Sequence, residues 1–339
     1  MNALRELDPA EADAWFAVLP PALRLCGLSP AFGRADVQRT SGLRCVHVGY
    51  EEGGQRWLHT FHVREIAKFG FAHSSPYGYG GPLASCEDPA FLARAWEAYV
   101  LWAGERGVLG EVCLFHPEAR QERFFRGRII PNRVTVSVDL RADPLEGQYS
   151  ALARRKLRRA RGLDVRWSTS EADWLAFGGF YREAMARMGA HPRYHFSDRY
   201  FAAIAAVPGV ELCICSDSQG WLSSAVYLFH RAEGADAGEG TVEYHLGAST
   251  ERGKQAGAAY LIQHAAAQEG RRRGLANLYL GGGTTPDEDN PLLFYKRAFS
   301  RRERLFSLGR AVHHETLFAQ FVRSRGYDRS NAPDNILFD

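Results

Sequence analysis

The sequence predicts a mixed α/β protein in which mostly antiparallel sheets are flanked by helices, arranged as two domains. In several segments apolar and polar residues alternate, which is the period of a half-buried strand. In others apolar residues recur every three or four positions, which is the period of an amphipathic helix. Both halves of the 339-residue chain contain this mixture, and with 45% hydrophobic residues each half can build its own core.

The first half is expected to contain a hairpin, two further strands and two helices. The segments "LRCVHVGY" (43–50) and "RWLHTFHV" (56–63) alternate like paired strands, with 51–54 as their turn. A valine stands at every second position from Val134 to Val138, which predicts a strand with one buried face. The remaining elements expected here are a strand over 107–116, the full valine strand over 132–140, and helices over 9–18 and 88–106.

The second half begins with a basic helix. Its apolar residues lie on one stripe from Tyr149 to Ala160, and Gly162 is a natural stop signal. Further helices are expected over 172–190, 197–206, 255–273, 291–299 and 311–325. Strands are expected over 163–169, 210–217, 221–230, 241–249, 276–281 and 303–309, with a turn at 218–220 and a Gly/Asp/Ala loop at 234–240. We place the joint between the domains near 141–148, so that 1–146 with 311–339 forms one domain and 147–310 the other.

Composition and charge exclude several classes of protein. The net charge of +3 is close to neutral for this length, so the overall field does not indicate a partner. The first residues, "MNALRELDPAEADAWF", do not have the pattern of a signal peptide, and no apolar run approaches a membrane span, so we expect a cytoplasmic protein. The six cysteines show no Cys-x-x-Cys pair or histidines at zinc spacing, so we expect reduced thiols and no metal site. Cys213 and Cys215 are expected to face the core from one strand.

The stretch "LGGGTTPDEDNPLLFYKRAFS" (280–300) has glycines between a strand and a helix, as nucleotide loops do. A dinucleotide fingerprint would need a third glycine where Pro286 stands, and a P-loop would need a lysine directly after the glycines. Here the acidic run 287–289 intervenes, and it would repel a phosphate. The glycines are therefore expected to end a strand tightly, and Lys296, among apolar neighbours, is expected to meet either water or an anion.

Four segments together resemble the FemAB family and its GNAT-like relatives. The family's Leu-x-x-Phe-Lys-x-x-Phe motif is matched at 292–299, with Tyr295 in place of the first phenylalanine. The other similar segments are "SSPYGYGGPLAS" (74–85), "RRKLRRARGLDVR" (154–166) and "FYREAMARMGAHPRYHFSDRYF" (180–201). The resemblance covers most of the chain from about residue 40 and implies tandem GNAT-like domains, the first on the acceptor side and the second on the donor side.

The resemblance also implies transfer of an acyl or aminoacyl group to an amine. Lys296 then stabilises negative charge at the ester under attack, which agrees with the general use of fixed cations beside a developing oxyanion. In the peptidoglycan branch the donor is aminoacyl-tRNA and the acceptor is a cell-wall precursor. The substrate-binding residues implied in this way are Tyr77, Tyr79, Gly80, Arg187, Tyr194, Tyr244 and Tyr295. Leu246 stands where wall-precursor enzymes tend to have a second tyrosine, so the acceptor stays open.

The donor has two candidates, and no tightly bound cofactor is expected. Lys254, Gly257 and Ala259 have the spacing of a pyrophosphate loop for acyl-CoA, although close packing of a helix on a sheet would also explain the glycine. Basic runs at 154–161, 271–273 and 301–304 could contact the phosphates of tRNA, and no base-reading motif accompanies them.

No general base is evident in the sequence. Glu243 and His245 are expected to face away from Tyr244, since side chains alternate along a strand. Two alternatives therefore stay open beside aminoacyl transfer. One is acyl-CoA-dependent N-acetylation of a small metabolite or polysaccharide precursor, and the other is a non-catalytic protein that binds an anionic ligand.

Overall fold

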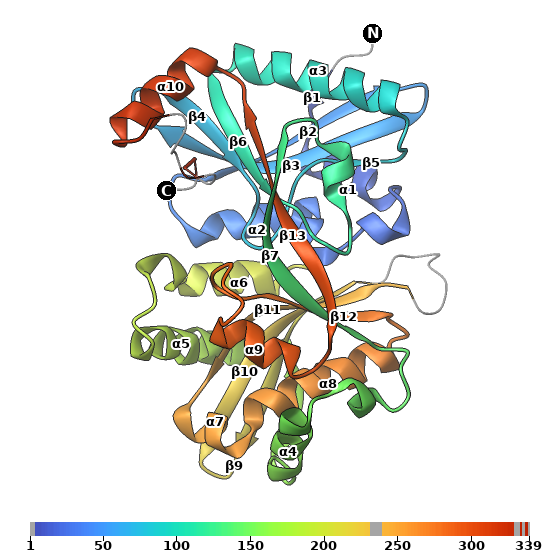
Figure 1. The fold of residues 1–339 in the computed structure, drawn as a ribbon, viewed down its shortest axis with the longest axis vertical. Coiled ribbons are helices and arrows are strands. Elements are labelled where there is room, and N and C mark those ends of the chain that lie inside the picture. Colours follow the sequence, from blue (N-terminus) through green and yellow to red (C-terminus); the bar gives the residue numbers. More distant parts are fainter. Residues whose placement is uncertain (1–3, 231–238, 329–332, 334–335, 338–339) are drawn as a thin grey trace. The chain divides into compact units, whose positions relative to one another are not determined.

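The computed structural model describes the chain except residues 1–3, 231–238, 329–332, 334–335 and 338–339. The chain divides into two units, each with its own hydrophobic core (Figure 1). Unit 1 comprises Met1–Asn132 and Phe306–Asp339, and unit 2 comprises Arg133–Leu305. Two strands, β7 (Arg128–Asp139) and β13 (Arg302–Val312), each contribute one end to each unit.

Unit 1 has a mixed sheet of strand order β1-β2-β3-β4-β6-β13, with the short β5 paired to β3. All neighbours are antiparallel except β4 and β6. Its other strands are β1 (Arg5–Glu6), β2 (Arg44–Glu52), β3 (Gln55–Ile66), β4 (Gly70–Ser74), β5 (Leu83–Ala84) and β6 (Val108–Leu114). Its α-helices are α1 (Pro9–Ala17), α2 (Pro30–Asp36), α3 (Pro89–Glu105) and α10 (Glu315–Ser324).

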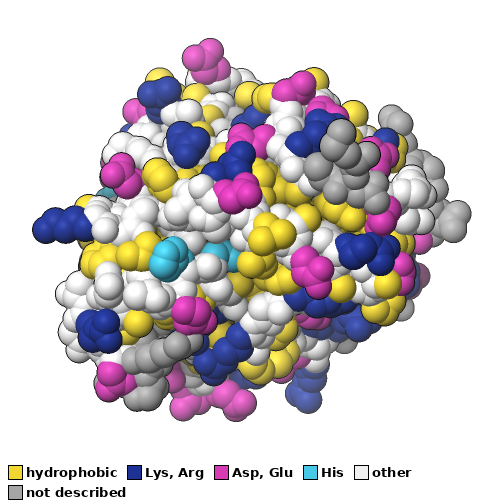
Figure 2. Space-filling model, turned by 90° about the horizontal axis from the view of Figure 1, so that it is seen from above, with side chains coloured by type: hydrophobic (Ala, Val, Ile, Leu, Met, Phe, Trp, Pro, Cys, Tyr) yellow, Lys and Arg dark blue, Asp and Glu magenta, His cyan; other side chains and the backbone are white. Residues whose placement is uncertain are grey.

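The long helix α3 covers part of the unit 1 sheet (Figure 1). It begins where sequence chemistry favours a helix start, because Asp88 caps two backbone amides and Pro89 follows at the first helical position. Its buried residues recur every three or four positions, and among them Tyr99 and Trp102 pack over β3 and β4. The face of the molecule in Figure 2 shows basic and acidic side chains interspersed, without a broad area of one sign.

Unit 2 has a mostly antiparallel sheet of order β7-β12-β11-β10-β9-β8, in which β11 and β12 run parallel. Its strands besides β7 are β8 (Asp164–Ser168), β9 (Val210–Asp217), β10 (Gly220–His230), β11 (Thr241–Ser249) and β12 (Asn277–Gly282). Its α-helices are α4 (Ala151–Arg159), α5 (Glu171–Arg187), α6 (Asp198–Ala205), α7 (Glu251–Ala256), α8 (Ala258–Arg272) and α9 (Pro291–Arg297). The predicted α/β class with mostly antiparallel sheets and flanking helices is therefore confirmed.

The helices of unit 2 lie on opposite faces of this sheet. On one face Tyr227 of β10 donates to the carbonyl oxygen of Ile262 in α8 at 3.2 Å. On the other face His245 of β11 lies 3.2 Å from the hydroxyl of Tyr200 in α6. Because β11 alternates, Tyr244 faces the α8 side, where its ring centroid lies 5.7 Å from that of Tyr227. The expected opposition of Tyr244 and His245 is confirmed.

Two predicted helices were wrong in their extent. The helix expected over 255–273 is two helices, because Gly257 adopts φ +85° between α7 and α8. The helix expected over 311–325 begins only at Glu315, since residues up to Val312 continue β13 and pair with β6. Most of the loop predicted at 234–240 lies outside the described residues. In the described part of the chain, no helix is both long and apolar enough to span a membrane.

Candidate active site around Lys296

Lys296 lies on α9 in unit 2, with only 6% of its surface exposed. Its Nζ donates to the carbonyl oxygen of Gly282, the last residue of β12, at 2.7 Å. The ammonium also lies 5.7 Å from the centroid of the Tyr244 ring, within the range of a cation–π contact. The lysine is therefore held between the end of β12 and an aromatic ring of β11, the neighbouring strand in the sheet.

The glycines before α9 allow this close approach. A Cβ atom on Gly282 would lie 2.5 Å from the carbonyl oxygen of Val134, and one on Gly283 would lie 2.7 Å from the side chain of Asn290. Asn290 caps α9 by accepting from the amides of Leu292 and Leu293. The stretch thus ends a strand and starts a helix within a tight space, which explains the glycines without a nucleotide.

Burial changes the acidity of Lys296. Desolvation, followed by repulsion from Arg133, lowers the pKa of Lys296 from 10.5 to about 7. The Arg133 guanidinium is held by its own hydrogen bond, in which Nη1 donates to the carbonyl oxygen of Gly283 at 2.8 Å. The side chains of Lys296 and Arg133 thus donate to the carbonyl oxygens of two consecutive residues, Gly282 and Gly283. Such an arrangement favours an anion nearby, which would keep the lysine protonated.

Arg133 was not predicted from the sequence. It stands in an alternating strand with valines at every second position, a pattern in which an arginine looks like an ordinary surface residue. Its proximity to Lys296 depends on the pairing of β7 with β12, where Thr135 lies opposite Gly282. That pairing joins residues about 150 positions apart and has no local signal in the sequence.

Tyr244 is the predicted substrate residue that lies beside Lys296. Burial raises the pKa of Tyr244 to about 12, so its hydroxyl stays protonated at neutral pH. Its ring lies over Gly247, where an added Cβ would approach the Tyr244 hydroxyl to 2.3 Å. A protonated hydroxyl and an ammonium on the same side of the sheet are both hydrogen-bond donors suited to an oxyanion or a phosphate.

Tyr295 directs its hydroxyl into the protein. It donates to the carbonyl oxygen of Ala259, in the first turn of α8, at 2.6 Å. Its ring contacts Tyr260 and Phe299 at centroid distances of 5.0 and 5.6 Å. Burial raises the pKa of Tyr295 well above its usual value. The residue joins α9 to α8 and so positions the neighbouring Lys296.

The predicted pyrophosphate loop lies at the junction of α7 and α8. Lys254 forms an exposed ion pair with Glu251 at 2.6 Å. A Cβ atom on Gly257 would lie 2.5 Å from the carbonyl oxygen of Lys156 in α4. Packing of α4 against the junction therefore explains the glycine in the absence of any ligand.

Arg187, the last residue of α5, and Tyr194, which follows the helix, are predicted substrate residues with different exposure. Arg187 is exposed at the end of α5 and donates to the carbonyl oxygen of Ser249, at the end of β11, at 3.4 Å. Tyr194 is partly exposed, and its hydroxyl accepts from Arg193 at 3.2 Å. No described contact joins either residue to Lys296.

The basic clusters differ in whether acidic side chains pair with their arginines. Arg273 pairs with Glu211 and Glu269, both at 2.6 Å, and Arg271 pairs with Asp143 at 3.2 Å. These are structural ion pairs. By contrast, four exposed arginines on and just after α4 form no ion pair with any described residue. They are Arg155, Arg158, Arg159 and Arg161. The α4 cluster is therefore available to phosphate groups.

Tyr77, Tyr79 and Gly80 belong to unit 1. The amide of Tyr77 donates to the carboxylate of Asp36 at 2.8 Å, and the amide of Gly80 donates to the carbonyl oxygen of Leu114 at 2.8 Å. The ring of Tyr79 contacts His116 edge-on at a centroid distance of 4.6 Å. These contacts fix the loop on the sheet of unit 1.

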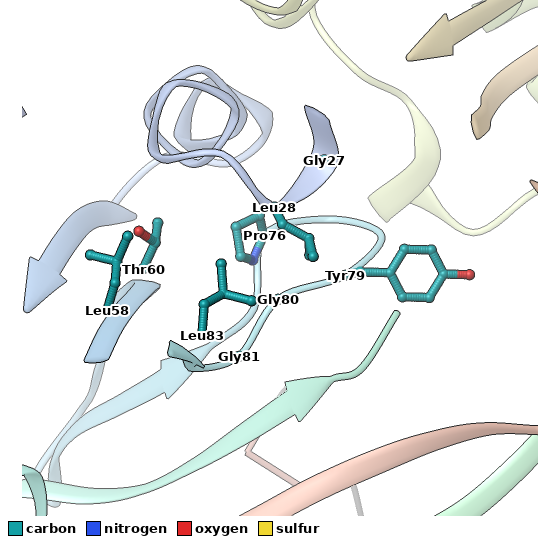
Figure 3. Close-up of a pocket in the computed structure, with 9 residues that line it drawn as sticks. All are labelled: Gly27, Leu28, Leu58, Thr60, Pro76, Tyr79, Gly80, Gly81 and Leu83. Carbon is teal, nitrogen blue, oxygen red and sulfur yellow. The ribbon is translucent and has the colours of Figure 1, made fainter. Parts of the chain in front are cut away.

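A small cavity lies under this loop. Its volume is about 10 Å³, which is room for one water molecule at most. Figure 3 shows the Tyr79 ring pointing away from the side chains of Leu58, Thr60 and Leu83. The hydroxyl of Tyr79 is thus directed out of the cavity.

Comparison with known proteins identifies the fold. No protein-family model matches the chain, and no curated protein matches it in sequence. Solved structures do match, and they define a tandem GNAT fold. One is a tandem GNAT protein from the clavulanic acid biosynthesis pathway, with a TM-score of 0.52, 10% identity, and coverage of 93% of this chain and 99% of that one.

The same comparison includes FemX, which is similar with a TM-score of 0.64 and 14% identity over 90% of this chain and 96% of that one. L-PGS from Bacillus licheniformis is similar with a TM-score of 0.60 and 14% identity, over 92% of this chain and 96% of that one. At these identities the likeness shows the fold. It confirms the resemblance to FemAB-type and GNAT-like proteins that the motifs indicated.

Proposed function

We propose that the protein is an acyltransferase of the FemAB type, which moves an aminoacyl group from an activated ester to an acceptor amine. The observation that carries the proposal is the buried Lys296, held at the end of β12 beside Arg133 and Tyr244. Its support from comparison is the fold shared with FemX and L-PGS.

The chemistry follows from the donors on Lys296. An ammonium has three N–H donors. Among the described residues one is accepted by the Gly282 carbonyl, which leaves two for a ligand. When an amine attacks an ester, negative charge develops on the carbonyl oxygen, and a fixed cation in a dry site stabilises it. The negative charge of the bound donor would also raise the pKa of Lys296 and keep it cationic.

Two observations favour an aminoacyl-tRNA donor over acyl-CoA. Gly257 is explained by the packing of α4, so the helix junction needs no pyrophosphate to account for its sequence. The exposed, unpaired arginines of the α4 cluster suit a long polyanion, which gains affinity from several phosphate contacts at once. Acyl-CoA-dependent N-acetylation is the second candidate, because Lys254 and the start of α8 still lie beside this basic helix.

Calorimetric titration of the full chain with aminoacyl-tRNA and, separately, with acetyl-CoA tests the donor. We expect tRNA to bind and acetyl-CoA to bind weakly or not at all. Tight binding of acetyl-CoA without binding of tRNA would replace the proposal with the N-acetyltransferase.

Transfer of a labelled aminoacyl group to a panel of amines then tests the activity. We expect Lys296→Met to lose transfer, whereas Lys68→Met, which replaces an exposed lysine of unit 1 with no assigned role, should retain it. If Lys296→Met and the wild-type protein transfer at the same rate, the assigned role of Lys296 is wrong.

A further inference from the structure

A second cluster of reactive side chains lies in unit 1, and none of its members is among the predicted site residues. It is centred on Glu111 of β6, whose side chain is 1% exposed. His59 of β3 and His313, directly after β13, are both 0% exposed, and Cys113 is buried two positions along β6. The cluster thus brings two imidazoles, a carboxylate and a thiol together from three strands.

Most polar atoms of the cluster have no hydrogen-bond partner. One carboxylate oxygen, Oε2, accepts from Tyr99 and lies 3.0 Å from Nε2 of His59. The other oxygen, Nδ1 of His59 and both ring nitrogens of His313 are buried without a hydrogen bond among the described residues. Buried polar atoms left in this way each cost free energy, and a metal bound by Oε1 of Glu111 and one ring nitrogen of His313 would satisfy two of the four.

The distances between the side chains are close to those in a zinc site. One ligand atom each from His59, Glu111 and Cys113 lie within 4.8 Å of one another. Oε2 of Glu111 lies 3.0 Å from Nε2 of His59 and 3.8 Å from Sγ of Cys113, and the other oxygen, Oε1, lies 3.5 Å from Nε2 of His313. Tetrahedral zinc, with bonds of about 2.0–2.3 Å, separates its ligand atoms by about 3.3–3.7 Å.

We propose that His59, Glu111 and Cys113 bind a structural Zn²⁺ ion, and that His313, whose Nε2 lies 3.5 Å from the other carboxylate oxygen of Glu111, moves in as the fourth ligand and closes the site. With a thiolate, a carboxylate and two neutral imidazoles the site has no net charge, which suits its burial beneath aromatic rings. Binding requires the Cys113 thiol to release its proton to solvent, and the sulfur then ligates the metal. Imidazole and thiolate ligands favour zinc over calcium or magnesium.

Tyr99 positions the carboxylate for this role. Its hydroxyl donates to Glu111 and accepts from Nδ1 of His73, at 3.0 and 2.8 Å. Burial lowers the pKa of His73 to about 3, so His73 is neutral and its Nδ1–H is available as the donor. A ligand held by such an outer chain of hydrogen bonds is typical of protein metal sites. Metal ligands were sought at short spacing in the sequence, whereas these side chains lie on or directly after three separate strands.

Elemental analysis of the full chain, purified without a metal-affinity step and dialysed against EDTA, tests the site. We expect about one zinc ion per chain, because a closed site releases metal slowly. As a second measurement, the protein is refolded with Co²⁺, whose bond to a thiolate absorbs in the near ultraviolet. Wild-type protein that holds no zinc and gives no cobalt–thiolate absorption after refolding would overturn the proposal.

A matched pair of cysteine variants identifies the ligand. Cys113→Ser should lose the cobalt–thiolate absorption, whereas Cys215→Ser, which replaces a buried cysteine of unit 2, should keep it. Loss in Cys215→Ser with retention in Cys113→Ser would also overturn the site. Should Cys113→Ser fail to fold, the metal content and cobalt absorption of the wild-type protein still decide.

Discussion

Replacement of Lys296 by methionine is expected to stabilise unit 2 at pH 7. In the unfolded chain the lysine has its ordinary pKa of 10.5, whereas in the folded protein burial lowers that pKa to about 7. Methionine has a similar length and no charge, so it removes the cost of burying the ammonium. Lys296, which we assign to catalysis, thus lowers the stability of the fold.

The size of the effect follows from the two pKa values. They differ by about 3.5, which at about 1.4 kcal/mol per unit corresponds to about 5 kcal/mol of lost stability well below pH 7. At pH 7 half of the folded molecules have released the proton, and the loss is about 4 kcal/mol. Methionine leaves the Gly282 carbonyl without its donor, which costs about 1–3 kcal/mol. The net expectation is a gain of about 1–3 kcal/mol in the free energy of unfolding.

The gain should depend on pH with a definite sign. Between pH 7 and pH 10.5 the unfolded wild-type chain binds more protons at Lys296 than the folded chain, so wild-type stability rises with pH. Lys296→Met lacks this rise, and its advantage should therefore shrink between pH 7 and pH 9.5. Below pH 7 the lysine is protonated in both states and the advantage should be constant.

Urea unfolding of both proteins at pH 6, 7, 8.5 and 9.5 measures this difference, and hydrogen exchange of β10 assigns it to unit 2. Lys254→Met is the control, since an exposed lysine should change stability by no more than about 0.5 kcal/mol. A Lys296→Met protein that is less stable than wild type by the same amount at every pH would refute the reasoning, because the lysine would then not be desolvated.

Three further predictions follow from the site. The affinity for an anionic donor should fall about 30-fold between pH 6 and pH 8.5 as Lys296 deprotonates near pH 7, and calorimetry of Lys296→Met should show a flatter profile. Replacing Arg155, Arg158 and Arg159 by glutamine should lower the slope of log K for tRNA against log salt by about 2–3, and an unchanged slope would exclude α4 from phosphate contact. Gly282→Ala should lower the free energy of unfolding by about 1–3 kcal/mol, because its Cβ would meet the Val134 carbonyl. Gly179→Ala, at an open position within α5, should raise the free energy of unfolding by about 0.5–1 kcal/mol. Equal effects of the two substitutions in urea unfolding would contradict this account.

Local patterns predicted most elements of the fold, and the misses have physical causes. The apolar period of 255–273 is continuous, but the approach of the α4 backbone to Gly257 divides the helix. Residues 311–312 look helical in isolation, yet they pair with residues of β6 that lie about 200 positions earlier in the chain. Pairing over such distances is decided by tertiary packing that local propensity does not contain.

The candidate site was only partly visible in the sequence. Lys296 was singled out because it stands in a short motif with apolar neighbours, and Tyr244 because its strand resembles the family's Tyr-x-Tyr segment. Arg133 and the cluster around Glu111 were missed, since their members approach one another only after distant strands pair. Tyr295 was predicted to bind substrate, and in the structure its hydroxyl donates to the Ala259 carbonyl oxygen. This contact joins two helices, and the spacing of residues along the chain does not reveal it.

The division of unit 1 into two segments has a consequence for synthesis on the ribosome. Unit 2 is complete once residue 305 has emerged, whereas unit 1 still lacks the end of β13 that pairs with β6. Nascent chains usually fold from the N-terminus onward. In this protein the second unit can finish first, and the first waits with an unpaired strand edge, which is prone to aggregation. The segment from Phe306 onward, which includes His313, thus completes a unit whose other residues precede unit 2 in the chain.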